Sequence, residues 1–248
     1  VGQTAIAAAS LAGQIQFILF LIFIGISSGL VMLTAQYWGK KDVESIKTLV
    51  GIALRLSVIS GIIFALLAAF FPKFLMRIFT DDINLIIEGA KYLRIVSISY
   101  IFLSISQVYQ AAFKSVERVK EVSKIIIFAL GLNVILNALF IYGLFGLPKM
   151  GIIGVALATS IARFVEVFIC LFYGLKLKEF KLNPSVIFRK DKNLTFDFYK
   201  YSMPALGNEF VWGAAFAMYS VIMGRLGEDI VAANSVVNVV RNLASVVC

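Results

Sequence analysis

Three polar side chains lie in long apolar runs, at spacings that could bring their oxygen atoms together. Asn133 and Asn137 are four residues apart, so on a helix they share one face. Thr159 follows Val155 by the same interval in the next apolar run. Amide and hydroxyl oxygens are hard ligands that suit Na⁺ or a hydrogen-bonded acid. The plainer interpretation stays open: such side chains also bond neighbouring helices, for about 1 kcal/mol.

Charged residues occur in the apolar runs as well. Glu209 lies five residues after Pro204. Proline kinks helices and marks a candidate hinge, while a buried carboxylate beside it could take up and release a proton; a structural partner is the alternative for Glu209. Arg163 and Glu166 are three apart and are expected to neutralise each other on one helix face. We interpret that pair as structural, and Arg55 in the same way.

Other polar and small residues complete the set of candidates. Four polar side chains could line a cavity, although the sequence does not say which helix faces point inward: Gln36, Gln107, Tyr109 and Gln110. Small residues at helix contacts let backbones approach closely, and four glycines are placed to do so: Gly25, Gly29, Gly51 and Gly61.

The composition places these residues in a membrane. Hydrophobic residues make up 60% of the 248 residues and charged residues 15%, against about 45–50% and 25% in soluble domains. There is no His, and the two cysteines, Cys170 and Cys248, are far apart. No zinc or redox motif can be built from them, and no nucleophile–base pair is apparent. We therefore expect an all-α integral membrane protein that is not an enzyme and carries no cofactor.

Charge-free stretches predict the membrane spans, because a helix needs about 20 apolar residues to cross the hydrocarbon core. Six predicted spans and the start of a seventh follow, at about 5–36, 45–71, 85–113, 121–145, 151–177, 197–224 and from Ile230. Lys and Arg favour every second connection between these spans by 14 to 4, which places that set of loops in the cytoplasm. The net charge of +9 is thus a topology signal, and no nucleic-acid partner is expected.

The longest connection divides the chain. Residues 178–196 alternate Phe, Leu and Ile with Lys and Arg, which fits either a segment lying on an anionic membrane surface or a plain solvated linker. The predicted domains are transmembrane helices at 1–177, a cytoplasmic linker at 178–196, and a second set of helices at 197–248. The chain starts at Val1 and stops in an apolar run, so we expect a fragment of a larger membrane protein.

A weak internal repeat supports that expectation. Residues 2–10 and 227–235 are identical at four of nine positions. Six predicted helices separate the two copies, so both point the same way through the membrane. This arrangement predicts two parallel six-helix halves, as in transporters, and a whole protein of roughly 450 residues and twelve helices.

Several strings resemble the multidrug and toxic compound extrusion (MATE) transporters. They are Ala35–Asp42 (AQYWGKKD), Gly154–Thr159 (GVALAT), Pro204, Asn208-Glu209, Trp212-Gly213 and Gly224–Gly227 (GRLG). No single string is highly specific, but their order and spacing together are. The resemblance covers essentially the whole chain, as helices two to eight of twelve. It implies a polytopic helical bundle with two six-helix lobes, of which this chain holds the N-lobe without its first helix and the start of the C-lobe.

The resemblance also implies roles for the polar residues. MATE transporters have a cation or proton site in the N-lobe, made by an Asp on the first helix and polar groups on helices five and six. Asn133, Asn137, Thr159 and the Val155 carbonyl fall at the matching positions. Two departures matter: some members have Asp in place of Asn137, and the first-helix Asp lies outside this sequence. Some relatives carry an ion-coupling Glu on the helix of Glu209, but farther from the proline.

The function implied is cation-coupled efflux, in which Na⁺ or H⁺ entry drives export of small, cationic and amphipathic compounds by alternating access between two lobes. The expected protein is a monomeric, multi-pass protein of the cell membrane. One alternative is a lipid-linked oligosaccharide flippase of the same superfamily, which favours an Arg-lined cavity with Arg55, Arg163 and Arg241 as candidates. Another is a membrane scaffold without transport, which the polar cluster disfavours.

Overall fold

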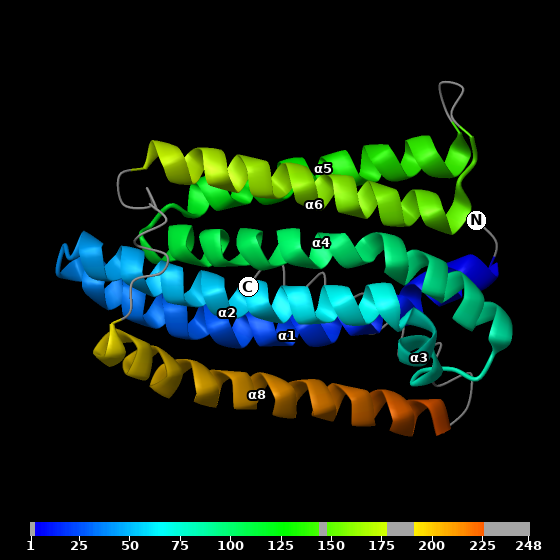
Figure 1. The fold of residues 1–248 in the computed structure, drawn as a ribbon, viewed down its shortest axis with the longest axis horizontal. Coiled ribbons are helices and arrows are strands. Elements are labelled where there is room, and N and C mark those ends of the chain that lie inside the picture. The colour runs from blue at the N-terminus through cyan, green and yellow to red at the C-terminus, as the bar shows by residue number, and fades with distance from the viewer. Residues whose placement is uncertain (1–2, 144–147, 178–190, 226–248) are drawn as a thin grey trace. The chain divides into compact units, whose positions relative to one another are not determined.

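Helices make up the described part of the chain, which in this computed structural model comprises residues 3–143, 148–177 and 191–225 (Figure 1). They are α1 (Gln3–Gly39), α2 (Val43–Phe70), α3 (Pro72–Arg77), α4 (Ile83–Ser115), α5 (Val119–Tyr142), α6 (Gly151–Lys176) and α8 (Lys192–Arg225). No strand occurs within those three ranges. The prediction of an all-α chain is confirmed.

The long helices follow the predicted spans to within a few residues. Five of the described helices are long and apolar enough to cross a membrane: α1 from Ala7, α2, α4, α5 and α6. Helix α8 contains the span predicted at 197–224 but is not among these five, and it begins at Lys192, inside the stretch expected to be linker. The predicted seventh span, Arg241 and Cys248 lie outside the described residues. The short helix α3 was not predicted.

Side chains at the helix ends explain where the elements begin and stop. The Asp42 carboxylate caps α2: it accepts hydrogen bonds from the Ser45 hydroxyl at 2.6 Å and from the Ser45 N–H at 3.1 Å. These two bonds hold the pKa of Asp42 below its ordinary value of 3.8. Asp82 caps α4 in the same manner. Gly143, with φ of 68°, ends α5 in the left-handed conformation that favours glycine.

Helix α4 is the central helix of the bundle, and it packs against α1, α2 and α6 (Figure 1). Its side chains Leu93, Tyr100 and Phe113 are completely buried. Five of its serines are buried too, and each hydroxyl donates to the backbone carbonyl three residues earlier, at 2.6–3.2 Å: Ser97, Ser99, Ser104, Ser106 and Ser115. These local bonds satisfy the five serine hydroxyls inside the bundle.

Glycines allow the close helix contacts that the sequence predicts. A Cβ added at Gly61 of α2 would lie 3.0 Å from the Tyr100 carbonyl oxygen of α4. A Cβ at Gly29 of α1 would overlap the Ser202 hydroxyl on the first half of α8, and one at Gly25 would come within 2.7 Å of Leu206. The expected close approach is therefore confirmed at these three glycines.

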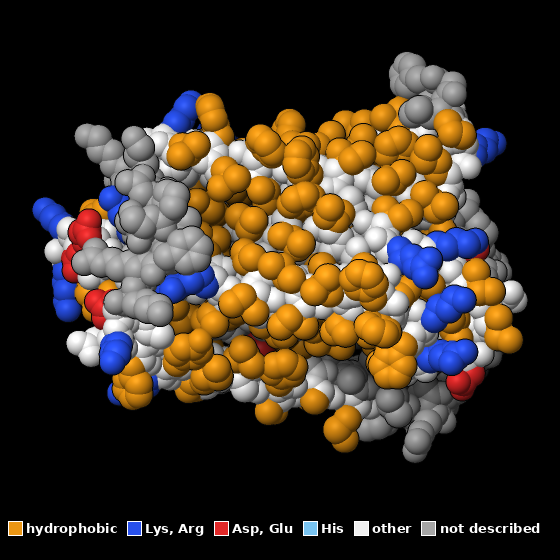
Figure 2. All heavy atoms as spheres, viewed as in Figure 1, with side chains coloured by type: hydrophobic (Ala, Val, Ile, Leu, Met, Phe, Trp, Pro, Cys, Tyr) orange, Lys and Arg blue, Asp and Glu red, His pale blue; other side chains and the backbone are white. Residues whose placement is uncertain are grey.

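The surface has the distribution expected of a membrane protein. In Figure 2, hydrophobic side chains cover the middle of the visible face, and Lys and Arg gather toward its two ends. Large apolar side chains such as Ile63 and Phe128 are at least half exposed. Lys91 and Arg94, which lie inside a predicted span, are exposed in the first turns of α4, at the end opposite to Lys40. Counting these two residues on the outer side reduces the excess of Lys and Arg in the cytoplasmic connections but does not reverse it.

The chain divides into two compact units, Val1–Leu206 and Gly207–Cys248. The first unit contains α1 to α6 and the first half of α8. In the second unit, the described residues form the remaining half of α8. The division falls two residues after Pro204, whereas the predicted second set of helices begins at residue 197.

Candidate functional site

A polar cavity of about 280 Å³ lies between α4, α5 and α6, within the first unit. Six of its lining residues carry polar or charged side chains: Gln107, Gln110, Asn133, Thr159, Arg163 and Glu166. The remaining wall is apolar and is formed by Ile126, Ala129, Leu130 and Ala162. The cavity therefore combines a few convergent polar groups with an apolar lining, which is typical of small-molecule sites.

The structure brings together most of the residues predicted for a cation site. Asn133 of α5 and Thr159 of α6 both line the polar cavity. Asn137 lies one turn further along α5 and donates from Nδ2 to Asn133 Oδ1 at 2.9 Å. The Thr159 hydroxyl donates to the Val155 carbonyl at 2.9 Å. The two pairs thus present amide, hydroxyl and carbonyl oxygens from adjacent helices.

One oxygen of this group differs from the others in its hydrogen bonding to the described residues. Asn137 Oδ1 is buried and accepts no hydrogen bond from the described residues, although its amide nitrogen is bonded to Asn133. A buried unsatisfied acceptor costs about 1–3 kcal/mol. A cation or a protonated group beside Asn137 would remove that cost, so the arrangement fits a positively charged or hydrogen-donating ligand.

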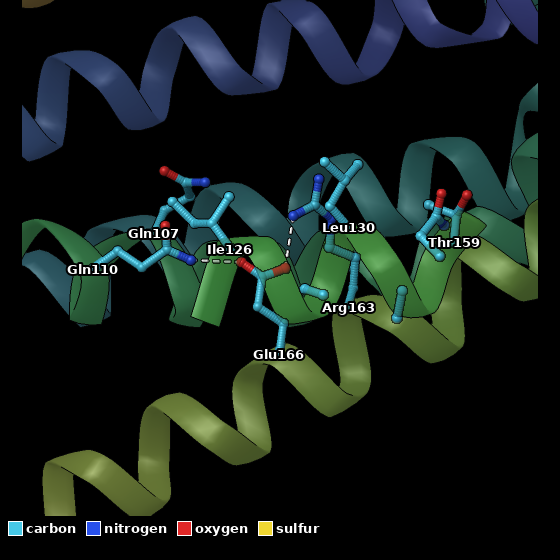
Figure 3. Close-up of a pocket in the computed structure, with 10 residues that line it drawn as sticks. Gln107, Gln110, Ile126, Leu130, Thr159, Arg163 and Glu166 are labelled. Atoms are coloured by element: carbon cyan, nitrogen blue, oxygen red, sulfur yellow. Dashed lines mark hydrogen bonds and ion pairs between the residues drawn. The ribbon is translucent and has the colours of Figure 1, made fainter. Parts of the chain in front are cut away.

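A buried carboxylate joins two helices at the other end of the polar cavity. Glu166 of α6 is 2% exposed. Its Oε2 pairs with Arg163 Nη1 at 2.7 Å, and its Oε1 accepts from Gln110 Nε2 of α4 at 2.5 Å. Figure 3 shows Gln110 and Arg163 converging on Glu166 from opposite sides, with Thr159 farther along the cavity. Both carboxylate oxygens are engaged, and the Arg163 side chain, 32% exposed, is the more accessible partner.

The sequence predicted this network only in part. The spacing of Arg163 and Glu166 correctly predicts an ion pair on one helix face, but it does not place the pair on a cavity wall. Gln110 was predicted to line a cavity, and it does; its bond to Glu166 crosses 56 residues of sequence. The signal available was the three-residue spacing of Gln107 and Gln110, which puts both amides on one face of α4.

Two residues predicted to line a cavity lie away from this one. Gln36 is exposed near the end of α1, where its carbonyl accepts a bond from the Lys40 N–H. Tyr109 is buried, packs against Phe113 and lies beside Gly174 of α6. Helix geometry explains why Tyr109 does not line the polar cavity. It is adjacent in sequence to Gln110, and successive side chains on a helix are rotated by about 100°.

The residues predicted for proton coupling and hinge motion lie on α8. The helix continues through Pro204, whose side chain is exposed. Glu209 is partly exposed and belongs to the second unit. Their roles stay predictions.

Comparison with known proteins links the chain to one group. The family model MatE matches residues 1–139. The "Probable multidrug resistance protein YoeA" of Bacillus subtilis is 28% identical over 244 residues, covering 97% of this chain and 53% of the relative. The "Probable multidrug resistance protein NorM" of Thermotoga maritima is 24% identical, covering 94% and 50%. The chain spans about half the length of the curated relatives it matches.

Solved structures share the fold. One is described as the "Outward-facing conformation of a multidrug resistance MATE family transporter of the MOP superfamily"; it superposes with a TM-score of 0.84 at 18% identity, over 97% of this chain and 53% of that one. The "Inward-facing conformation" of such a transporter gives a TM-score of 0.75 at 18% identity, over 84% of this chain and 47% of that one. At this identity the likeness shows the fold alone.

Proposed function

The chain belongs to the MatE family, and from that premise we propose that the protein is a cation-coupled antiporter that exports several kinds of small toxic compound. The predicted family resemblance and the MATE-type membrane fold are confirmed. It is a multi-pass protein of the cell membrane. Relatives named as multidrug resistance proteins support drug export, and no enzymatic activity is proposed.

The observation that carries the coupling proposal is the unsatisfied Asn137 Oδ1. Asn133, Thr159 and the Val155 carbonyl lie on the same two helices and supply further oxygens. We assign the coupling ion, Na⁺ or H⁺, to this group. These four residues carry no charge, so they would hold an ion weakly unless a carboxylate from another helix completes the site. The Asp that MATE transporters carry on their first helix is the proposed supplier.

We assign substrate binding to the part of the polar cavity that is lined by Gln107, Gln110 and Glu166. Amide groups and an apolar lining accept chemically varied compounds, while the paired Arg163 and Glu166 add no net charge to the cavity wall. At about 280 Å³ the cavity holds part of a drug-sized molecule, so the proposed second lobe supplies the remaining contacts. Following the family resemblance, the proposed partners are cationic amphipathic compounds and the bilayer, and the proposed working unit is a monomer.

Alternating access is assigned to motion between two lobes. The division between the compact units falls at Leu206, within two residues of Pro204. Proline removes one backbone hydrogen bond from a helix, so this point is the proposed hinge. Structural neighbours solved in outward-facing and inward-facing conformations support two such states. Glu209, just beyond the hinge, is the candidate for proton exchange.

Flux through proteoliposomes that contain the full-length protein tests the ion assignment. Asn137→Ala and Thr159→Val are expected to weaken activation by Na⁺ or H⁺ about tenfold, equivalent to 1.4 kcal/mol, because each removes a ligand oxygen. Ser123→Ala is the matched control, since Ser123 is an exposed residue of α5 whose hydroxyl bonds its own helix at Val119. Unchanged ion affinity in both site variants would disprove the assignment.

Two further variants separate Na⁺ from H⁺ and efflux from lipid flipping. Asn137→Asp restores the carboxylate found in some relatives and is expected to make transport depend on pH; Glu209→Gln should alter that dependence only if Glu209 exchanges protons. The flippase alternative requires an accessible cationic wall, but the Arg163 guanidinium is paired with Glu166. Transfer of a labelled lipid-linked oligosaccharide, without drug-stimulated ion flux, would favour the flippase.

A further inference from the structure

A second cavity, the interfacial cavity, lies between α2 and the start of α8 and has a volume of about 550 Å³. Its α2 wall is formed by Ile52, Arg55 and Leu56. The opposite wall consists of Asp191, Lys192, Thr195, Phe196 and Tyr199. All of these residues belong to the first compact unit. The proposed efflux function makes no use of them.

Two cations, Arg55 and Lys192, line the interfacial cavity. The Arg55 Nε donates to the Gly51 carbonyl at 3.3 Å. Gly51 is one turn nearer the start of α2, so this bond draws the guanidinium toward the end of the bundle where Lys40 and Lys41 lie. Lys192 is exposed in the first turn of α8. An anionic group between Arg55 and Lys192 would be attracted by both.

The one carboxylate among the lining residues of the interfacial cavity is already engaged. Asp191 Oδ1 accepts hydrogen bonds from the N–H groups of Asn193 and Leu194, both at 3.0 Å. These bonds cap the beginning of α8, so one oxygen of the carboxylate is engaged with the backbone of the helix. The balance of charge among the lining residues is positive, with two cations against one capped carboxylate.

The rest of the lining is largely apolar. Ile52 and Leu56 are one turn apart on α2, and Phe196 of α8 faces outward with 69% of its surface exposed. Tyr199 lies one turn beyond Thr195, farther from the charged start of α8. A hollow lined by two cations and by aliphatic and aromatic side chains matches a molecule with an anionic head and a hydrocarbon tail.

The position of the cavity in the membrane points to the same class of ligand. Lys40, Lys41 and Lys114 belong to the connections that the Lys and Arg bias places in the cytoplasm. Helix α8 begins from another of these connections, so the α8 wall of the interfacial cavity lies on the cytoplasmic side, while its α2 wall lies near the middle of α2. The cytoplasmic leaflet carries anionic lipids, and basic pockets between helices on that side bind their head groups. A small soluble anion has no hydrocarbon part that could contact the apolar wall.

We infer that the interfacial cavity binds one anionic phospholipid of the cytoplasmic leaflet, with its phosphate between Arg55 and Lys192 and an acyl chain against Ile52, Leu56 and Phe196. The bound lipid would fasten the first turns of α8 to α2, on the side of Pro204 that belongs to the first unit. This inference rests on the membrane location of the protein and not on its transport activity.

Lipid binding to the purified full-length protein in detergent tests the inference. Phosphatidylglycerol is expected to raise the midpoint of thermal unfolding by about 3 °C, whereas phosphatidylcholine with the same acyl chains and inorganic phosphate should not. In native mass spectrometry, Lys192→Gln should weaken phosphatidylglycerol binding about fivefold, because it removes one of two cations. Lys192 is exposed, so this variant keeps the fold even if Arg55→Gln does not.

A matched control distinguishes the cavity from general surface charge. Lys124 is exposed near the same end of the bundle, on α5, and does not line the interfacial cavity. Lys124→Gln should therefore leave phosphatidylglycerol binding unchanged. Equal losses in Lys124→Gln and Lys192→Gln, or a thermal shift reproduced by inorganic phosphate or phosphatidylcholine, would overturn the inference. Drug transport is not part of this measurement, so its absence would bear on the proposed efflux function alone.

Discussion

Helices α4 and α5 both have the length of a membrane span, yet they differ in a way that is opposite to soluble proteins. The most apolar stretch of α4 has the lower mean hydropathy of the two, and 67% of its residues are buried inside the bundle. In the corresponding stretch of α5, 11% are buried. The less apolar helix occupies the interior because lipid, unlike water, accepts apolar side chains and rejects polar ones.

The two helices also differ in the hydrogen-bond partners of their polar side chains. The buried serines of α4 donate to carbonyls of their own helix, and Gln110 bonds Glu166. On α5, Asn133 and Asn137 bond each other, but one oxygen of Asn137 accepts no bond from the described residues. The Tyr100 hydroxyl of α4 also has no partner among the described residues, but it lies in an apolar core cluster, whereas the Asn137 oxygen lies beside the other residues of the proposed ion site. Substitutions that change burial or pairing on either helix test this distinction.

Removing the partner of the buried carboxylate should have the largest effect. Arg163→Met leaves Glu166 in the interior without its counter-charge, which is expected to lower the free energy of unfolding by on the order of 3 kcal/mol. The exposed third of Arg163 places the cost at the low end of the range for buried pairs. Reversible unfolding in mixed micelles measures it.

A double variant provides the control for that measurement. Arg163→Met combined with Glu166→Leu removes both charges and should recover most of the lost stability. If the double variant is no more stable than Arg163→Met, the pair does not act through charge compensation and the contrast with α5 fails.

A pair of glycines gives the next largest difference. Gly61→Leu should lower the free energy of unfolding by about 1–3 kcal/mol, because its Cβ would lie 3.0 Å from the Tyr100 carbonyl of α4. Gly131 of α5 has nothing within 4 Å of the same position, so Gly131→Leu should be neutral or stabilising by up to about 1 kcal/mol through helix propensity. Similar losses in the two variants would mean that α5 is as tightly packed as α4.

The smallest expected effect lies outside the membrane, at the start of α2. The lowered pKa of Asp42 means that its contribution to stability is present above the ordinary value of 3.8 and is lost as pH falls through the lowered one. Asp42→Asn should cost less than about 1 kcal/mol at neutral pH, since Asn also caps helices and solvent screens the carboxylate. The difference from wild type should shrink below about pH 4; a difference independent of pH would show that the carboxylate charge plays no part.

The sequence was sufficient for the long helices but not for the contacts between them. Charged residues such as Lys41 and Lys114 lie at helix ends, so their positions predicted the spans to within a few residues. Ile127 and Tyr100 are both hydrophobic, however, and nothing local distinguishes the exposed side chain from the buried one. The periodicity that separates faces in a soluble helix is weak when both surroundings are apolar.

The candidate site was predictable to the extent that its residues are close in sequence. Asn133 with Asn137, and Val155 with Thr159, are each one helical turn apart, so helix geometry alone pairs them. The bond from Gln110 to Glu166 depends on the packing of α4 against α6 and has no local signal. The spacing of Gln107 and Gln110 puts both amides on one face of α4, but nothing in the sequence says that this face, and not the face of Tyr109, borders the polar cavity.

The ion pair on α6 has a consequence for how the helix enters the bilayer during synthesis. Arg163 and Glu166 are one turn apart on the same helix, so α6 leaves the translocon as a span whose two internal charges already cancel. Helix α4, with Gln110, precedes α6 in the chain and is inserted first. The Gln110 amide, which donates to the Glu166 carboxylate, is therefore synthesised before Glu166.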